Sequence, residues 1–199
     1  MKVCELVWRD PLGVAIDLDG GKVYWAAQGA RKIQRANLNG TNVEDVATGL
    51  GVGAGNGIID LAIDVNGGKI YWTDGGEGRK IQRVALDGSS PVETIIESSG
   101  NPTGIALDPN GQKVYWTDRT NRTINRANLN DSNIETIITA PGAFLGAITL
   151  DVQGSKIFYK ESGVGFSNTI KRADLNGTGI VTIVADAGEI GGFAVSESP

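Results

Sequence analysis

One unit of about 45 residues occurs four times along the 199-residue chain, and this periodicity restricts the fold more than any other feature. The start of each unit is the clearest part of the pattern. It is a short apolar run that ends in aspartate, at Gly13–Asp17, Asp60–Asp64, Gly104–Asp108 and Ala147–Asp151. The chain is therefore an array of similar structural units, with repeats at approximately 12–48, 58–97, 102–139 and 145–186.

Each unit continues with three further short runs, separated by turns rich in glycine and asparagine. The second run is a lysine followed by β-branched and aromatic residues, at Lys22–Trp25, Lys69–Asp74, Lys113–Asp118 and Lys156–Tyr159. The third run holds an Ile-x-Arg core with its arginines at Arg35, Arg83, Arg126 and Arg172, and the fourth mixes acidic residues and threonine with aliphatic residues. Such runs between turn formers are typical of β-strands. We predict that each unit is an antiparallel sheet of four strands, with Asn-Gly or Asp-Gly hairpin turns of type I′.

The packing of these sheets follows from what they must bury. No segment shows a 3.6-residue apolar period, so we expect few helices or none. A lone four-stranded sheet cannot cover both of its faces, whereas sheets repeated around an axis cover one another. We predict an all-β propeller with four complete four-stranded blades, in a single domain over residues 1–199. The first run of each unit is apolar almost throughout, which favours the innermost position.

The two ends of the chain add single strands of incomplete blades to this prediction. Val3–Val7 aligns with the fourth strand of a preceding blade, and Gly192–Ser196 with the first strand of a following one. Three arrangements fit: a fragment of a longer propeller, a small or distorted ring that the terminal strands close, and an open arc that another chain completes. Unpaired strand edges would favour self-association in the first and third arrangements.

Two of the units carry a motif with a known counterpart. Tyr71-Trp72-Thr73-Asp74 and Tyr115-Trp116-Thr117-Asp118, with the flanking elements of the repeat, resemble the YWTD repeats of the low-density lipoprotein receptor family, also called class B repeats. The resemblance implies a propeller, usually of six blades, that recognises protein ligands outside the cell or docks against a neighbouring module. The first unit has Ala26-Ala27 where the motif has Thr-Asp, and the fourth has Lys160-Glu161. We expect these two blades to lose the structure that the motif aspartate stabilises at the end of the second strand, with Glu161 as a partial substitute in the fourth blade.

The residues that are missing exclude several kinds of enzyme. The chain contains no histidine, so it cannot build a Ser-His-Asp or Cys-His nucleophile system, an HExxH metalloprotease site or a His-ligated metal site. Cys4 is the only cysteine, which rules out an intramolecular disulfide and a Cys-x-x-Cys zinc or redox site. A conventional cofactor is therefore not expected.

Charge and hydropathy limit the partners and the location. The net charge is −5, and no basic run could neutralise a phosphate backbone, so we predict no nucleic-acid partner. No segment approaches the ~20 apolar residues of a membrane span, and the first residues lack the apolar stretch of a signal peptide. The residues alone do not determine the cellular compartment, while the family resemblance implies an extracellular location.

Residues that recur in every unit are interpreted as structural. Asp17, Asp64, Asp108 and Asp151 end the first strands and would gather at one mouth of the channel, where carboxylates could hold Ca²⁺. The interpretation we favour is that each aspartate caps its own turn. The repeated arginines are expected to serve the blades, and Trp25, Trp72 and Trp116 to pack between them.

Residues that differ between units are the candidates for binding. The connections before each first strand and after each second strand emerge on one face, and we name this surface the loop face. Its variable residues are Arg9, Asn56, Asp60, Glu77, Arg79, Asn101, Arg119, Phe144, Glu161 and Phe166. This mixture of charges, amides and aromatic rings favours a non-enzymatic module that binds a protein or peptide. The alternatives are a propeller hydrolase or lactonase with an Asp/Asn metal site, and a purely structural propeller fragment.

Overall fold

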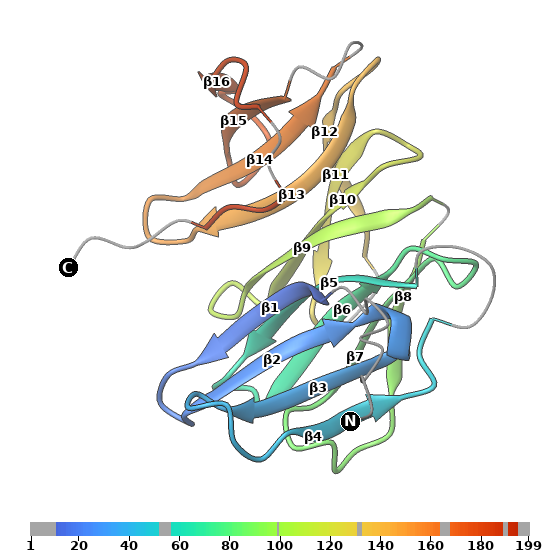
Figure 1. The fold of residues 1–199 in the computed structure, drawn as a ribbon. Coiled ribbons are helices and arrows are strands. Elements are labelled where there is room, and N and C mark those ends of the chain that lie inside the picture. Colours follow the sequence, from blue (N-terminus) through green and yellow to red (C-terminus); the bar gives the residue numbers. More distant parts are fainter. Residues whose placement is uncertain are drawn as a thin grey trace, which may run out of the picture.

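The computed structural model describes residues 11–51, 57–98, 100–130, 133–163, 168–188 and 191–194, and it contains four separate four-stranded antiparallel sheets (Figure 1). The first two sheets consist of β1 (Pro11–Asp17), β2 (Lys22–Ala27), β3 (Lys32–Asn37) and β4 (Glu44–Thr48), and of β5 (Ile58–Asp64), β6 (Lys69–Asp74), β7 (Lys80–Ala85) and β8 (Glu93–Glu97). The other two consist of β9 (Pro102–Asp108), β10 (Lys113–Asp118), β11 (Thr123–Asn128) and β12 (Glu135–Thr139), and of β13 (Phe144–Asp151), β14 (Lys156–Ser162), β15 (Asn168–Asp174) and β16 (Val181–Val184). The only helix in the described residues is the short 3₁₀ segment Gln28–Ala30. The predicted all-β class and the four blades are confirmed.

The hairpin between the third and fourth strands differs from the predicted type. A type I′ turn needs positive φ at both central residues, but in the first blade only Gly40 has it, with φ 82°. The Gly40 N–H donates to the Asn37 carbonyl and the Asn37 N–H to the Thr41 carbonyl, so glycine sits in a bulge after an ordinary turn. The Asn39 side-chain oxygen accepts the Thr41 N–H at 3.1 Å, which holds this longer turn.

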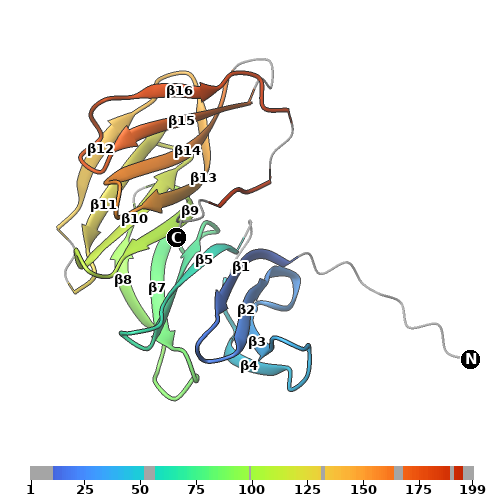
Figure 2. The same cartoon turned by 90° about the vertical axis from the view of Figure 1, so that its left-hand side faces the viewer.

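The four blades follow one another around an axis that their first strands line. Strand β1 contacts β5, β5 contacts β9, and β9 contacts β13, so the first strand of each blade is innermost, as predicted. Figure 2 shows that the blades form an arc whose two ends are the first and fourth blades. Val3–Val7 lies outside the described residues, and Gly191–Phe193 borders the same axial cavity as β13 without strand structure.

Between neighbouring blades lies a hydrophobic core, so the described chain has three such cores. Trp72 is 0 % exposed and belongs to the core between the first and second blades, together with Tyr24 and Ile33 of the first blade. Trp116 is 1 % exposed in the next core. The prediction that these tryptophans pack between blades is therefore confirmed for both. Trp25, at the same position in the first blade, is partly exposed because no blade precedes it among the described residues.

The threonine of the YWTD motif joins each blade to the next near the axis. The Thr73 hydroxyl donates to the Thr103 carbonyl at 2.5 Å, and the Thr117 hydroxyl donates to the Gly146 carbonyl at 2.7 Å. Both acceptors lie on the first strand of the following blade. Buried hydroxyls need such partners, since an unmade hydrogen bond costs on the order of 1–3 kcal/mol. Ala26, at the same position in the first blade, cannot make this bond.

The repeated arginine makes a second link between blades. Its guanidinium donates to a leucine carbonyl of the following blade, from Arg35 to Leu86 at 3.0 Å, from Arg83 to Leu129 at 2.8 Å and from Arg126 to Leu175 at 3.2 Å. The same arginines pair with the acidic residue opposite them on their own fourth strand, namely Glu44, Glu93 and Glu135. The structural interpretation of these arginines is confirmed. Arg172 of the fourth blade is exposed, and the residue opposite it on the fourth strand is Val181 instead of an acidic residue.

Candidate functional site: the loop face and the axial cavity

Of the ten predicted loop-face residues, the structure describes seven. Arg9, Asn56 and Phe166 lie outside the described residues. The others fall into three groups: residues that hold loops in place, residues exposed on the loop face, and one residue that points to the axis. They are Asp60, Glu77, Arg79, Asn101, Arg119, Phe144 and Glu161.

The aspartate of the YWTD motif organises the loops at the loop face. One Asp118 oxygen accepts the N–H of Asn101 at 3.1 Å and that of Asn121 at 2.9 Å. Asn101 belongs to the connection that enters the third blade and Asn121 to the turn that follows β10, so the carboxylate ties two loops together. Asp74 accepts the Gly76 N–H at 3.2 Å, in the turn directly after its own strand. Asn101 is therefore positioned as part of the scaffold.

Glu161 does not reproduce this role in the fourth blade. Its carboxylate pairs with the Lys171 ammonium at 2.7 Å, and both side chains are largely buried. The pair links neighbouring strands β14 and β15 instead of capping a loop. The longer glutamate side chain reaches across to the next strand. Glu161 therefore does not substitute for the motif aspartate, contrary to the expectation from the sequence.

Glu77 and Arg79, in the turn after β6, are exposed.

Phe144 and two arginines form a cluster on the loop face, which we name the Phe144 cluster. Phe144 is the first residue of β13 and is 46 % exposed. The guanidinium carbons of Arg119 and Arg122 lie 5.2 and 5.4 Å from its ring centroid. Both distances are within the range of cation–π interaction, which contributes roughly 0.5–1 kcal/mol at exposed sites. The cluster joins the loop after β10 to the entry of the next blade.

Arg122 was not among the predicted site residues, although the sequence held a signal for it. It lies in the same four-residue turn as Arg119, after the motif Asp118. Its φ of 57° places it in the left-handed region, as is the case for Arg31 and Arg79 at the same position of the first two blades. The distance from Phe144 in the sequence hid the contact, because only the packing of two blades brings the two loops together.

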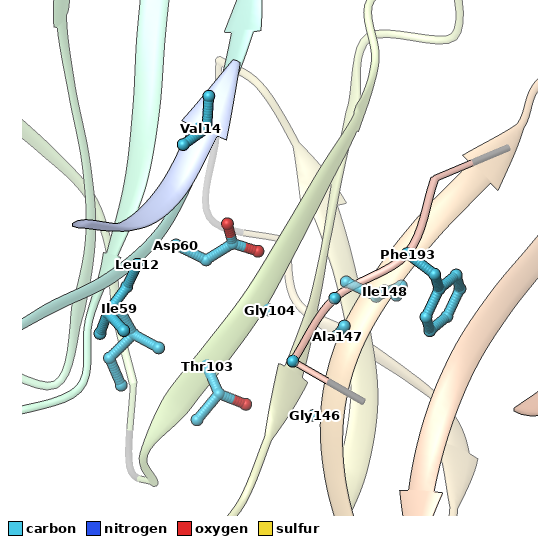
Figure 3. Close-up of a pocket in the computed structure, with 12 residues that line it drawn as sticks. Leu12, Val14, Ile59, Asp60, Thr103, Gly104, Gly146, Ala147, Ile148 and Phe193 are labelled. Atoms are coloured by element: carbon cyan, nitrogen blue, oxygen red, sulfur yellow. The ribbon is translucent and has the colours of Figure 1, made fainter. Parts of the chain in front are cut away.

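Asp60 lies at the axis and faces a cavity of about 430 Å³ that the first strands line (Figure 3). One of its carboxylate oxygens accepts the Leu61 N–H at 2.9 Å and the other accepts the Ile105 N–H of the next blade at 3.2 Å. Burial raises the pKa of the Asp60 carboxyl to about 6, and the two backbone N–H groups oppose this shift. Gly13 lies directly beside it, where a Cβ would come within 2.8 Å of an Asp60 oxygen.

The rest of the cavity lining is mainly apolar. Leu12, Ile59, Ile148 and Phe193 line it, and Thr103 adds one hydroxyl. The lining thus supplies one carboxyl and no amide side chain. The Asp/Asn metal site that a propeller hydrolase or lactonase would need is not assembled from these residues.

The four aspartates that end the first strands serve their own turns. Each accepts the N–H of a turn glycine three residues later, at 2.7 Å for Asp17, 2.8 Å for Asp64, 2.8 Å for Asp108 and 2.7 Å for Asp151. This is the turn-capping role that we favoured. Within the part of the chain that the structure describes, no three acidic side chains converge at metal-ligand spacing. Calcium binding at these aspartates stays a prediction.

The pKa of Asp60 gives an expected dependence of stability on pH. Because the folded-state pKa is about 6 and the ordinary value is 3.8, the folded protein retains a proton that the unfolded chain has released between these values. The free energy of unfolding should therefore fall as pH rises from about 4 to about 6, by up to about 3 kcal/mol, and change little above that. Urea unfolding of the wild type and of Asp60→Ala across this range measures the effect. An equal slope in both proteins would contradict the assignment to Asp60.

The arrangement of the sheets and the comparison with known proteins together identify the class of protein. Four radially packed, four-stranded antiparallel sheets with innermost first strands define a β-propeller. Residues 68–109 and 112–152 match the low-density lipoprotein receptor repeat class B family. The first segment spans β6 to β9 and the second spans β10 to β13. The resemblance of these segments to YWTD repeats is confirmed. No curated protein sequence gives a significant match.

Solved structures support the fold. A nidogen/laminin complex contains a chain with 23 % identity and a TM-score of 0.71, over 82 % of this chain and 60 % of that one. Virginiamycin B lyase from Staphylococcus aureus has 22 % identity and a TM-score of 0.66, over 87 % and 55 %. A gluconolactonase from Xanthomonas campestris has 19 % identity and a TM-score of 0.69, over 92 % and 64 %. The chain thus spans about three fifths of the length of these three chains. Its described part holds no helix that could cross a membrane.

Proposed function

We propose that this chain is a non-enzymatic propeller module that binds a protein or peptide on its loop face. The observation that carries the proposal is the Phe144 cluster, in which an exposed aromatic ring lies against two arginines. Aromatic residues and arginine are enriched among the residues that dominate binding energy at protein interfaces. Asp118 holds the turn after β10 that carries both arginines, so the guanidinium groups are positioned before a partner arrives.

The chemistry of the cluster also favours a kind of partner. Two guanidinium groups beside an apolar ring suit an acidic residue next to an apolar one, since arginine binds carboxylates through two parallel hydrogen bonds. The structural likeness to a chain of a nidogen/laminin complex is consistent with a protein partner, and the class B repeats support an extracellular location.

The proposal is tested with a peptide-display library selected on the immobilised wild-type chain. Peptides that carry an acidic residue should be enriched, and the double charge reversal Arg119→Glu and Arg122→Glu should weaken their binding about thirtyfold, the equivalent of a 2 kcal/mol loss. Arg31→Glu is the matched control, because Arg31 follows the second strand of the first blade and is exposed on the same face. Selected peptides that bind the double variant as tightly as the wild type would refute the proposal.

The alternative enzyme function has one observation in its favour. Asp60 is a carboxyl with a pKa of about 6 at an axial cavity, and the fold is similar to that of a lyase and a gluconolactonase. A screen of lactones and esters with added divalent metal ions tests it. Turnover that Asp60→Ala abolishes would favour the enzyme over the binding module.

A further inference from the structure

The first blade has an apolar face that no described residue covers. On the inner strand, Val14 is 58 % exposed and Ile16 is 54 % exposed. The residues at the position of Val14 in the other blades are Leu61, Ile105 and Ile148, and they are 4, 4 and 5 % exposed. We name the face that carries Val14, Ile16 and Trp25 the receiving face, because in each later blade it packs on the blade before it.

The three junctions inside the chain show what covers a receiving face. Leu61 and Trp72 of the second blade belong to the same core as Ile33 of the first blade. In the next two junctions the covering isoleucine is Ile81 and then Ile124. The partner surface is thus the opposite face of a blade, with an isoleucine and an arginine two residues later on its third strand. We name it the donating face.

Among the described residues, the donating face of the fourth blade is less covered than that of the other blades. Its third strand has Ile170 at the position of Ile33, Ile81 and Ile124, and these three are 0 % exposed while Ile170 is partly exposed. Arg172 occupies the position of the arginines that donate to a leucine carbonyl of the next blade. The equivalent leucine on the first blade is Leu38, which is 48 % exposed, whereas its counterpart Leu129 is 3 % exposed.

The first and fourth blades therefore carry complementary halves of a junction that the chain already makes three times. We propose that the donating face of the fourth blade docks on the receiving face of the first blade of a second copy of this chain. In this contact Ile170 covers Val14 and Trp25, and the Arg172 guanidinium donates to the Leu38 carbonyl. The contact is head-to-tail, so the surfaces that meet are different ones. Figure 2 shows the first and fourth blades at the two ends of the arc.

This junction is weaker than the internal ones, for a reason visible in the fourth blade. Phe158 replaces the tyrosine whose hydroxyl bonds the arginine in the other blades, and Val181 replaces the acidic partner. Lys160 stands where Thr73 and Thr117 make their bonds to the next blade. The assembly should accordingly form in a concentration-dependent manner.

The test is the mass of the purified chain in sedimentation and light scattering over a wide concentration range. The mass should rise from 20.8 kDa to at least twice that value. Val14→Asp removes the receiving face and Arg172→Glu removes the donating face, and each variant alone should stay monomeric. A monomeric wild type at every concentration would overturn the proposal.

Mixing the two variants separates a head-to-tail contact from simple hydrophobic association. Each variant keeps one intact face, so an equimolar mixture should regain a dimer, which also shows that both variants are folded. Val43→Asp is the matched control, since Val43 is 58 % exposed like Val14, and its counterparts Val92 and Ile134 stay 38 and 44 % exposed inside the array. Self-association of Arg172→Glu alone at wild-type strength would mean that receiving faces pair with each other, and would refute the proposed junction.

Discussion

Replacement of Trp72 by alanine is expected to lower the free energy of unfolding by about 3–5 kcal/mol, the cost of removing a large aromatic side chain from a core. Trp72 is 0 % exposed and fills the space between the first and second blades. Its indole N–H has no hydrogen-bond partner among the described residues, so the loss comes from packing alone. Domains of this size are stable by about 5–15 kcal/mol, which makes this change a large fraction of the total.

Trp25→Ala is the matched control for this prediction. Trp25 has the same place in the repeat and pairs with Val14 as Trp72 pairs with Leu61, but it is only partly buried. Its replacement should cost less than half as much in urea or thermal unfolding. Equal losses for the two variants would contradict the account, because they would mean that the first blade is covered as fully as the second.

Much of the fold could be predicted because the repeat displays the same strand pattern four times. Agreement between copies separates strands from turns, and the aspartate at the end of each first run marks a turn in every blade. The hairpin type could not be predicted in the same way. Asn-Gly is compatible with more than one turn, and the choice depends on the bond from the Thr41 N–H to the Asn39 side chain and on the pairing of Asn37 with Thr41.

The candidate site was predicted less completely, and the reason is contact between blades. Variation between repeats pointed to Arg119 and Phe144, but not to their proximity or to Arg122. Asn101 and Glu161 also vary, yet the first is held by Asp118 and the second by Lys171. Variation in a loop therefore does not distinguish a residue that binds from one that positions the loop, because the positioning contacts are made with residues on neighbouring strands that the loop sequence does not reveal.

The two middle blades are expected to be the stable centre of the molecule. Strand β10 is hydrogen-bonded on both sides, by β9 and β11, and five of its six residues are buried. Strand β16 pairs only with β15, and all four of its residues are exposed. Amides in well-packed central strands exchange only through global unfolding, whereas an exposed edge strand opens locally at little cost in free energy.

Native-state hydrogen exchange of the backbone amides is the measurement that tests this architecture most directly. The account predicts that the amides of β6 and β10 are the most protected and that those of β16 exchange at least about a thousandfold faster, equivalent to about 4 kcal/mol of opening free energy. Amides of β10 that exchange as fast as those of β16 would contradict the claim that successive blades are packed face to face around one axis.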